Sequence, residues 1–554
     1  MNRWFGCLVG MAVVSSLHAQ VRVPANPLQT LPRTEAPRQA PVQVNVQAPS
    51  EALQALLATR ITPSRFDVVG VKSVPFPEVA ALFVPMRGKV TTVGELVAAA
   101  DKVTAMYRAR GYALSFAFIP SQTFADGVVH VTVVEGYVAK VELRGDTGNM
   151  DKRLRAMAAR IVGERPLTQA TFERYTQLLG QLPGAKVSAN VPAPTTTDGA
   201  TTLVLDVTRK RYDLSYGLDF NHPGTQGVFS LLENGLTPLG EQLSVSTLFP
   251  NGGGQRLYNL GWTEPFGSDG WQGKVDATRY WGSPDTDNQL PAYLDHRLTQ
   301  DRLALSALYP IRLSNSERLN LTLGTYASRQ DDRYRNTDTG VLLALQSSVR
   351  VLNAELSWLK VNGKRTRQLS FGVFHGFDGL GAYSRAVTNL PVQLAITTPD
   401  VNFTRYTLNA AFADPWPHGF GTVFRAQGQY SDNALPSTEQ INFGGPSFAY
   451  AYDPGDAAGD SGWAASGELN RGFTVASKWV TGLTPYVVYQ TARVYLNGTR
   501  PLIDRLDSAA VGLRATDGKH YSIDFALAKP TGDKPPESDH RSTRWNLTFS
   551  YNLM

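Results

Sequence analysis

Apolar and polar residues alternate one by one along much of the C-terminal part of the chain. From Tyr212 to Phe220, aromatic residues and leucines occupy every second position, with aspartate, serine and glycine between them. The last segment, Trp545–Leu553, repeats this pattern, and many similar runs lie between the two. Because successive side chains of a strand point to opposite faces, this period of two predicts strands with one apolar and one polar face.

Three features of residues 211–554 favour an all-β transmembrane barrel over a soluble sandwich. The alternation continues for about 340 residues without a helix pattern, aromatic residues cluster near strand ends, and the final strand runs to the last residue. Aromatic girdles are typical of barrel strands at membrane interfaces. The last strand must pair with the first, because an open edge in lipid leaves backbone groups unpaired. At about 21 residues per strand and connection, the region predicts about sixteen antiparallel strands.

Residues 61–210 show another pattern, in which short strands alternate with helices. A capping-box sequence at Thr92 and Glu95 opens a helix that Gly111 ends. Further elements of this unit are strands at 66–71, 113–119 and 128–134. The next unit predicts a strand at 137–143, helices at 150–161 and 169–182, and strands at 186–191 and 202–207. Two units of about 75 residues each, 61–136 and 137–210, indicate a repeated α/β module.

The N-terminus has the pattern of an exported protein. In residues 1–19, Arg3 precedes an apolar run, and small residues lead to a cleavage site before Gln20, as in a secretory signal peptide. Residues 20–60 follow with six prolines and predict an extended leader. Its end, Ser50–Arg60, carries three leucines on one helical face. This segment fits either a short helix or a nascent helix without a partner.

Composition excludes several classes of function. The net charge of +6 comes without a dense Lys/Arg block, so we expect no nucleic-acid binding. The single cysteine, Cys7, lies in the signal peptide, and the eight histidines are scattered without a ligand spacing. We therefore expect no disulfide, metal or cofactor. The charged run from Arg329 to Arg335 is expected to face water on an extracellular loop.

The sequence Gly459-Asp460-Ser461-Gly462 imitates the nucleophile segment of a serine protease. The glycine that usually follows is Trp463, and none of the histidines lies in a recognisable catalytic setting. Because a serine nucleophile needs a base within hydrogen-bond reach, we expect no enzyme activity.

The order of segments and several motifs together resemble one family, the outer-membrane transporters of two-partner secretion (TpsB, haemolysin secretion/activation type). The modules would then be POTRA domains. The matching stretches are Tyr107–Tyr112, Ile119–Gln122, Gly127, Glu135–Gly136, Glu173–Arg174, Leu182–Gly184, Glu264–Ser268, Gly428–Gln429, Leu435–Gln440, Gly444–Gly445, Asp460–Gly462 and Glu468–Leu469. The resemblance covers residues 61 to 554 and implies POTRA modules at 61–136 and 137–210 before the barrel at 211–554.

The resemblance further implies that residues 444–463 form a long loop folded into the barrel lumen. The expected residues of this loop motif are Gly444, Gly445, Tyr450, Tyr452, Asp460 and Gly462. Relatives carry Val-Arg-Gly-Tyr at the loop tip, and their arginine pairs with an aspartate on the barrel wall. Here the matching positions are Tyr450 and Gln490. We predict a neutral hydrogen bond between these two side chains; the alternative is that the loop has simply drifted.

The first module carries candidates for a groove that binds an incoming chain. They are Tyr107, Arg108, Gly111, Tyr112 and Gln122. A strand beside the helix would pair with an extended peptide through backbone hydrogen bonds, which tolerates many sequences. The competing interpretation places Tyr107 and Tyr112 in the module core and leaves the arginines solvated.

The resemblance implies an outer-membrane pore, with its modules in the periplasm, that exports an unfolded partner exoprotein of β-helical class. Outer-membrane lipid would surround the barrel, and we expect a monomer. The main alternative is an insertase of the same superfamily that assembles other barrels. A passive porin would not need the modules, and a surface enzyme would rely on Ser461.

Overall fold

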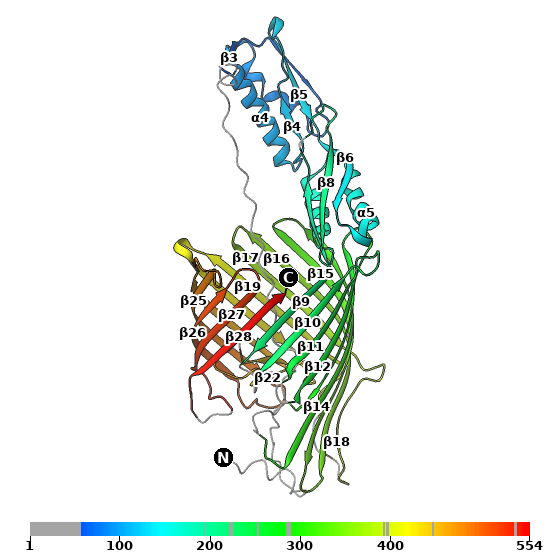
Figure 1. Cartoon of the computed structure of the whole chain (residues 1–554), viewed down its shortest axis with the longest axis vertical. Coiled ribbons are helices and arrows are strands. Elements are labelled where there is room, and N and C mark those ends of the chain that lie inside the picture. The colour runs from blue at the N-terminus through cyan, green and yellow to red at the C-terminus, as the bar shows by residue number, and fades with distance from the viewer. Residues whose placement is uncertain are drawn as a thin grey trace.

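The computed structural model describes residues 57–553, apart from residue 193 and seven short gaps. The gaps cover residues 221–224, 252–253, 284–289, 392–393, 395–397, 446–447 and 537–539. The predicted signal peptide, and most of the predicted leader with its short helix, lie outside the described residues. Figure 1 shows two stacked modules above a large barrel. No helix in the described ranges is long and apolar enough to cross a membrane.

The first module is a three-stranded sheet covered by two helices. Its elements are β2 (Arg65–Val69), α3 (Phe76–Ala81), α4 (Val93–Ala109), β4 (Phe116–Phe118) and β5 (Val128–Val134). The two-residue strands β1 (Arg60–Ile61), before β2, and β3 (Thr91–Thr92), before α4, pair with each other. Strand β5 lies in the middle, parallel to β2 and antiparallel to β4. The short helix α3 was not expected from the sequence, because six residues are too few to show a helical period.

Helix α4 begins and ends as its sequence predicts. The Thr92 hydroxyl accepts a hydrogen bond from the Glu95 N–H at 3.1 Å, and the Glu95 carboxylate accepts one from the Thr92 N–H at 2.9 Å. The helix buries one apolar face against the sheet, including Leu96 and Tyr107. Gly111 follows the helix with a φ of 87°, which glycine adopts without steric cost.

The second module repeats this arrangement. It consists of β6 (Tyr137–Gly145), α5 (Asp151–Val162), α6 (Gln169–Gly180), β7 (Ala185–Asn190) and β8 (Ala200–Arg209). The last strand, β8, again lies in the middle, parallel to the first strand and antiparallel to the other. The two modules join where the Gly111 carbonyl accepts a hydrogen bond from the Gln169 N–H at 2.5 Å and Leu114 packs on the second core.

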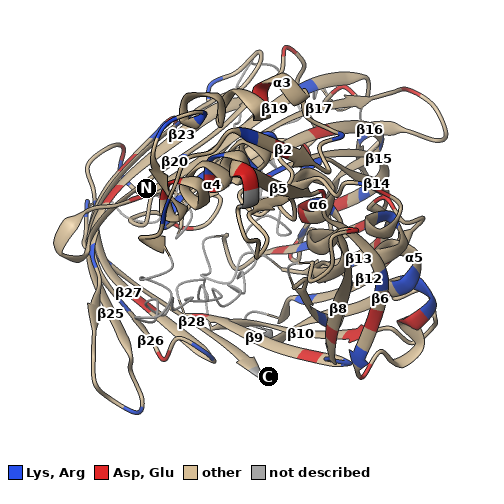
Figure 2. Cartoon of the chain, turned by 90° about the horizontal axis from the view of Figure 1, so that it is seen from above, with Lys and Arg blue, Asp and Glu red and all other residues tan. Residues whose placement is uncertain are grey.

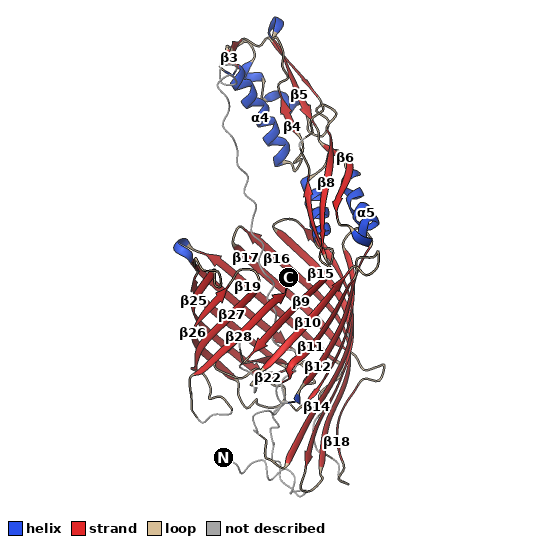
Figure 3. Ribbon diagram, in the orientation of Figure 1, coloured by secondary structure: helices blue, strands red, loops and turns tan. Residues whose placement is uncertain are grey.

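The rest of the chain closes into the predicted antiparallel barrel of sixteen strands (Figure 3). Its strand segments are β9 (Tyr212–Asp219), β10 (Gln226–Asn234), β11 (Gln242–Asn251), β12 (Arg256–Phe266), β13 (Trp271–Gly282), β14 (Leu294–Leu313), β15 (Glu317–Asn336), β16 (Leu342–Asn362), β17 (Arg365–Gly376), β18 (Tyr383–Thr388), β19 (Phe403–Pro415), β20 (Phe420–Tyr430), β23 (Ser461–Arg471), β24 (Phe473–Thr474), β25 (Gly482–Tyr495), β26 (Arg505–Thr516), β27 (Tyr521–Pro530) and β28 (Arg544–Leu553). Segments β17 and β18 both pair with β16, and β23 and β24 both pair with β25, so each pair forms one interrupted strand.

The last strand closes the barrel against the first, as expected. Strand β28 pairs with β9 from Thr548 opposite Asp219 to Leu553 opposite Leu214. The alternation sorts side chains as predicted: Leu303, Phe371 and Leu527 are exposed on the outer wall. Buried polar side chains such as Gln300 and Ser466 occupy the other face of their strands.

The charged run from Arg329 to Arg335 is not on a loop, contrary to expectation. It lies in β15, one of three strands of 20 or 21 residues that project beyond the rest of the barrel at the end away from the modules. Because the run alternates, Asp332 is buried on the inner face, where its carboxylate lies 2.6 Å from the His296 imidazole. The arginines of the run lie on the outer face of β15, the same face that carries its lipid-exposed residues nearer the modules.

Candidate functional site in the barrel lumen

Residues 431–460 leave the wall after β20 and fold back inside the barrel. Strands β21 (Ile441–Phe443) and β22 (Ala457–Gly459) form a small hairpin that is separate from the barrel sheet. Both strands are largely buried, as are most of the described residues between them. Phe443 and Phe448 meet edge to face with their ring centroids 5.9 Å apart. The loop is therefore an ordered core within the lumen, as the resemblance implies.

Asp460 fixes the base of this lumen loop. Its two carboxylate oxygens accept hydrogen bonds from the Leu435 N–H at 2.8 Å, the Gln440 side chain at 3.0 Å and the Asn497 N–H at 2.8 Å. Two of these donors belong to the loop, and Asn497 follows wall strand β25. Asp460 thus ties the loop to the wall by charge-assisted hydrogen bonds.

A buried ion pair holds the part of the loop that precedes β21. The Arg405 guanidinium, on β19, lies 3.1 Å from the Glu439 carboxylate, which also accepts a hydrogen bond from the Tyr326 hydroxyl at 2.6 Å. Arg405 also stacks on the Phe374 ring at 3.9 Å. Glu439 lies in a motif that the sequence singled out, but its partners are 34 and 113 residues away. No local pattern could have identified them.

The loop tip lies between wall strands β25, β26 and β28. The Tyr450 N–H donates to the Gln490 side-chain oxygen at 2.8 Å, and the Tyr450 carbonyl accepts from the Asn546 side chain at 2.9 Å. The next residue, Ala451, donates its N–H to the Ser508 hydroxyl at 3.1 Å. The tip backbone is thus held like an extra strand, but by side chains of the wall.

The predicted contact between the Tyr450 hydroxyl and the Gln490 amide is wrong in its atoms. Gln490 receives the backbone N–H of Tyr450, and the hydroxyl instead hydrogen-bonds with that of Tyr486. Tyr486 donates to Asp524 at 2.7 Å, and Asp524 pairs with Arg514 at 3.0 Å. Because the Tyr450 hydroxyl meets Tyr486 on β25, the side chain joins a network that already contains the wall arginine Arg514.

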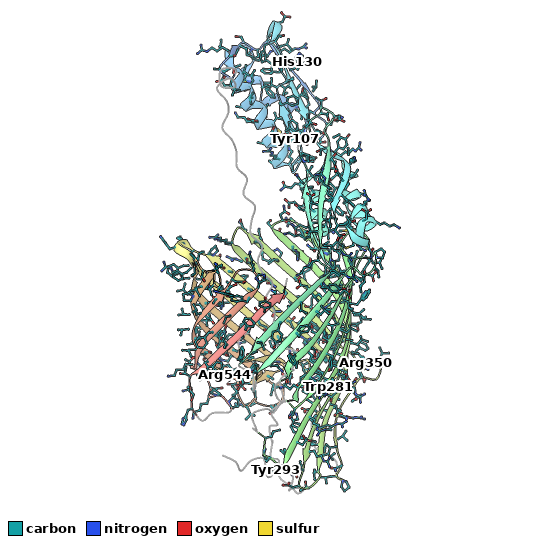
Figure 4. All side chains as sticks on the ribbon, viewed as in Figure 1. Tyr107, His130, Trp281, Tyr293, Arg350 and Arg544 are labelled. Carbon is teal, nitrogen blue, oxygen red and sulfur yellow. The ribbon has the colours of Figure 1, made fainter. Side chains whose placement is uncertain are left out.

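Beside the tip lies an ion pair in which the loop supplies the acid and the wall supplies the arginine. Asp453, in the loop, pairs with Arg544 on wall strand β28, whereas the resemblance implies an arginine in the loop and an acid on the wall. Figure 4 labels Arg544 on the barrel wall. Tyr452 adds a hydrogen bond from its hydroxyl to the Asp533 carbonyl at 2.7 Å. Arg544 was missed in the sequence because nothing local distinguishes it from other strand-end arginines.

Glycines are required where the loop backbone turns back on itself. Gly444 and Gly445 have φ values of 126° and 73°. A Cβ at Gly444 would lie 1.9 Å from the Asp453 carbonyl oxygen, and one at Gly462 would lie 2.8 Å from the Arg493 carbonyl oxygen. Only residues without a Cβ fit these approaches.

Ser461 takes part in a structural contact. Its hydroxyl accepts a hydrogen bond from the Ser431 N–H at 2.9 Å and donates one to the Ser431 carbonyl at 3.1 Å. This pair joins the first residue of β23 to the residue after β20. The nucleophile-like sequence therefore lies where the two ends of the lumen loop meet.

The groove candidates of the first module are divided between core and surface. Tyr107 is fully buried and donates a hydrogen bond to Glu135 at 2.9 Å, with the Tyr112 ring 5.9 Å away. Gln122 hydrogen-bonds with both backbone groups of His130 at 2.9 and 3.0 Å, on the part of the central strand β5 that β4 does not reach. Figure 4 labels Tyr107 and His130 in this module. Arg108 alone of the side chains extends into solvent. The burial of Tyr107 supports the interpretation that this residue belongs to the module core.

The second module rests on three turns of the barrel, a contact that the sequence did not predict. The Arg174 guanidinium on α6 donates to the carbonyls of Pro310 at 2.9 Å and Asp269 at 3.0 Å, and the Tyr175 hydroxyl donates to the Asp269 carboxylate at 2.6 Å. On α5, Arg153 donates to the Leu239 carbonyl at 2.7 Å. Seen from above in Figure 2, the second module lies over the β12–β14 side and leaves β25–β28 uncovered.

Burial and the Asp269 carboxylate raise the pKa of the Tyr175 phenol. The hydroxyl therefore remains a donor at neutral pH, which preserves its contact with the turn. The motif positions Glu173–Arg174 and Glu264–Ser268 were both noted in the sequence. The fold places both at the interface between the second module and the barrel, where Arg153 and Arg160 of α5 contact Gly267 and Ser268.

Comparison with known proteins gives matches along both parts of the chain. A model described as "POTRA domain, ShlB-type" matches residues 61–136, and one described as "Haemolysin secretion/activation protein ShlB/FhaC/HecB" matches residues 242–515. The heme/hemopexin transporter protein HuxB of Haemophilus influenzae is 20% identical over 487 residues, covering 83% of this chain and 82% of the relative. The outer membrane transporter CdiB of Escherichia coli is 23% identical over 525 residues, covering 88% and 82%.

Solved structures show the same fold. The structure of CdiB from Escherichia coli matches with a TM-score of 0.66 and 18% identity, covering 93% of this chain and 94% of that one. The structure of BamA from Haemophilus ducreyi lacking POTRA domains 1–3 matches with a TM-score of 0.54 and 14% identity, covering 89% and 100%. At these identities the likeness concerns architecture alone.

Proposed function

Because the chain belongs to the haemolysin secretion/activation (TpsB) family of outer-membrane transporters, we propose that it exports one unfolded partner exoprotein from the periplasm to the cell surface. The barrel lies in the outer membrane and the modules lie in the periplasm. The partner would dock on the modules, pass through the lumen once the loop withdraws, and fold outside. We expect it to be of β-helical class and to be encoded by a neighbouring gene.

The lumen loop is the observation that carries this proposal. Its tip backbone is held by single hydrogen bonds to Gln490, Ser508 and Asn546, each worth about 1 kcal/mol net. The Asp453–Arg544 ion pair and the hydrogen bond from Tyr452 to Asp533 add to these contacts. The wall itself is closed by continuous strand pairing, including β28 with β9. Moving the loop therefore breaks far fewer contacts than separating the strands. A pore with a removable internal loop suits transport of an unfolded chain.

A cysteine pair tests whether the loop must withdraw. In the variant with Ala451→Cys and Ser508→Cys, a disulfide would tie the tip to β26, since the two residues are already in contact. We expect secretion of the partner to stop in oxidised cells and to return on reduction, measured as partner in the culture medium. Each single variant is the control, and no other cysteine remains after cleavage of the signal peptide. Continued secretion with the crosslink fully formed would refute loop withdrawal.

For docking, we propose the outer edge of β2 as the strand that pairs with the partner. Among the described residues, no strand pairs with this edge, and Arg65 and Val69 at its ends are exposed. The edge of β4 is less accessible, because the Ala117 N–H already donates to the Thr104 hydroxyl of α4 at 2.9 Å. Backbone pairing at β2 would accept many sequences.

Photo-crosslinking distinguishes this edge from the groove predicted in the sequence. A crosslinking amino acid at Arg65 should capture the partner during secretion, and one at Arg108 should not. Capture at Arg108 alone would favour the groove beside α4. Cells that lack the protein should lose the partner from their surface and keep other outer-membrane proteins; a general loss of these proteins would indicate the insertase alternative.

A further inference from the structure

The outer wall of the barrel is basic near its extracellular end. In β15, Arg329, Arg333 and Arg335 face outward, with Asp331 between them. Neighbouring strands add Arg279 on β13 and Arg350 on β16, which share the outer face through their pairing with β14 and β15. Eight arginines and three aspartates face outward here: Arg256, Arg279, Arg297, Arg329, Arg333, Arg335, Arg350, Arg385, Asp295, Asp301 and Asp331.

This basic zone begins where the lipid-facing surface ends. Along β14, the outward residues change from Leu305 and Leu303 to Asp301, and along β15 they change from Ala327 to Arg329. The modules occupy the other end of the barrel, so this boundary belongs to the outer leaflet. Figure 4 labels Trp281 on β13 and Arg350 on β16 in this part of the wall.

A groove of about 760 Å³ crosses the boundary. Its apolar end is formed by Leu260 and Leu303, and its polar end by Arg279, Arg329 and Arg350. The wall is hollowed because the small side chains of Ala277, Ala327 and Ser348 face outward in the middle. Gly381, in the turn before β18, also lines the groove. A groove that is apolar on one side of an interface and cationic on the other suits an amphiphile with an anionic head group.

The arginines of the groove are held in place without being neutralised. Arg279 pairs with Asp301 at 3.5 Å, but both side chains remain about half exposed or more, at 63% and 48%. Arg279 and Arg256 both lie over the Trp281 ring, at 5.8 and 6.0 Å. Arg350 is oriented by the Ser348 hydroxyl at 2.9 Å rather than by an acid. The groove therefore holds three arginines against one aspartate.

We propose that this groove binds the phosphorylated lipid A part of lipopolysaccharide. Phosphate groups would lie against the guanidinium groups of Arg279, Arg329 and Arg350, whose planar fork matches phosphate geometry. An acyl chain would lie along Leu260 and Leu303. Lipid A combines these two features, and in Gram-negative outer membranes it occupies the leaflet that this zone faces. The bound lipid would be a fixed partner of the barrel wall, separate from the secretion pathway through the lumen.

Native mass spectrometry of the full-length protein in detergent tests the proposal, with bisphosphorylated lipid A as the probe. We expect the variant with Arg279→Gln, Arg329→Gln and Arg350→Gln to bind at least about tenfold more weakly, since one lost charge-assisted contact already has this effect. The variant Ala327→Trp keeps the charges but fills the groove, and it should also weaken binding. Dephosphorylated lipid A should bind like the triple variant.

The matched control removes three outward arginines at the module end, with Arg312→Gln, Arg365→Gln and Arg471→Gln. Its affinity should equal that of wild type, and all variants should retain the heat-modifiable mobility of a closed barrel on gels. Equal binding by the two triple variants would overturn the proposal. Equal binding of phosphatidylglycerol, or of lipid A without phosphates, would overturn it as well, since either result means nonspecific lipid contact.

Discussion

At the scale of single residues, Glu135 illustrates how one half-buried acid organises a module. Burial by itself favours its neutral form, but hydrogen bonds from the N–H groups of Ser73 and Lys72 hold the pKa of Glu135 below its ordinary value. The Tyr107 hydroxyl and the Ser73 hydroxyl donate as well. The acid thus joins the segment after β2, helix α4 and the end of β5.

We predict that Glu135→Gln destabilises the first module by about 1–3 kcal/mol, because buried donors lose a charged acceptor. All α-helices in the described ranges lie in the modules, so helical circular dichroism of the full-length protein reports their melting. Since the folded pKa is lowered, the contribution is complete above the unfolded value of 4.5 and is lost as the pH falls through the folded value. The variant should therefore lose this pH dependence; if it melts like wild type at pH 7, the role assigned to Glu135 is wrong.

Gln490 is the residue whose removal should loosen the lumen loop. In Gln490→Ala, the buried Tyr450 N–H loses its acceptor, at a cost of about 1–3 kcal/mol. We expect more frequent openings in planar-bilayer conductance. Gln300→Ala is the matched control, because Gln300 is also a buried, inward glutamine but no contact joins it to the loop tip. Tyr450→Phe should have a smaller effect than Gln490→Ala, since it removes only the hydroxyl contact with Tyr486. If Tyr450→Phe had the larger effect, the Tyr450 hydroxyl rather than its backbone N–H would be the group that holds the loop.

At the scale of elements, helices α5 and α6 of the second module make the contact with the barrel. Arg174 touches two turns at once and stacks on Tyr309 at 5.5 Å, so it sets the tilt of the module over the pore. Its removal should not unfold either part, because both keep their own cores.

We predict that Arg174→Ala broadens the orientation of the modules. Spin labels at Lys102 on α4 and at Lys364 in the β16–β17 turn would measure it, with a wider distance distribution than wild type as the expected result. Arg155→Ala is the control, since among the described residues Arg155 pairs only with Asp151 on its own helix. An unchanged distribution would show that the remaining contacts on the three turns suffice.

At the scale of the whole molecule, the barrel is stable because each strand separates a lipid face from a wet face. Phe371 is exposed on the outer wall, and its neighbour Ser370 points inward. We predict that Phe371→Arg lowers folding stability in lipid vesicles by about 2–4 kcal/mol, because a charge enters the hydrocarbon layer. Ser370→Arg should be tolerated. Equal effects of the two substitutions in urea titrations would mean that the assigned faces are wrong.

The sequence by itself determined the class of fold, because strand and helix periods are local properties of the chain. The capping box of α4, the repeat of the modules, the barrel of about sixteen strands and the two faces of its alternating runs all follow from spacing. The inward loop and its glycines came from family resemblance rather than from physics. The charged run in β15 was misplaced because high charge indicates exposure but does not distinguish a loop from a strand that projects beyond the membrane.

Only the tertiary structure decided which distant residues meet. The Glu439–Arg405 pair, the charge-reversed Asp453–Arg544 pair and the hydrogen bond from the Tyr450 N–H to Gln490 join loop residues to wall residues 34 to 91 positions away in the sequence. The same is true of Arg174 on the barrel turns and of the arginine groove on the outer wall. The physical reason is that alternation specifies the face of a side chain, whereas barrel closure and strand register specify its neighbours.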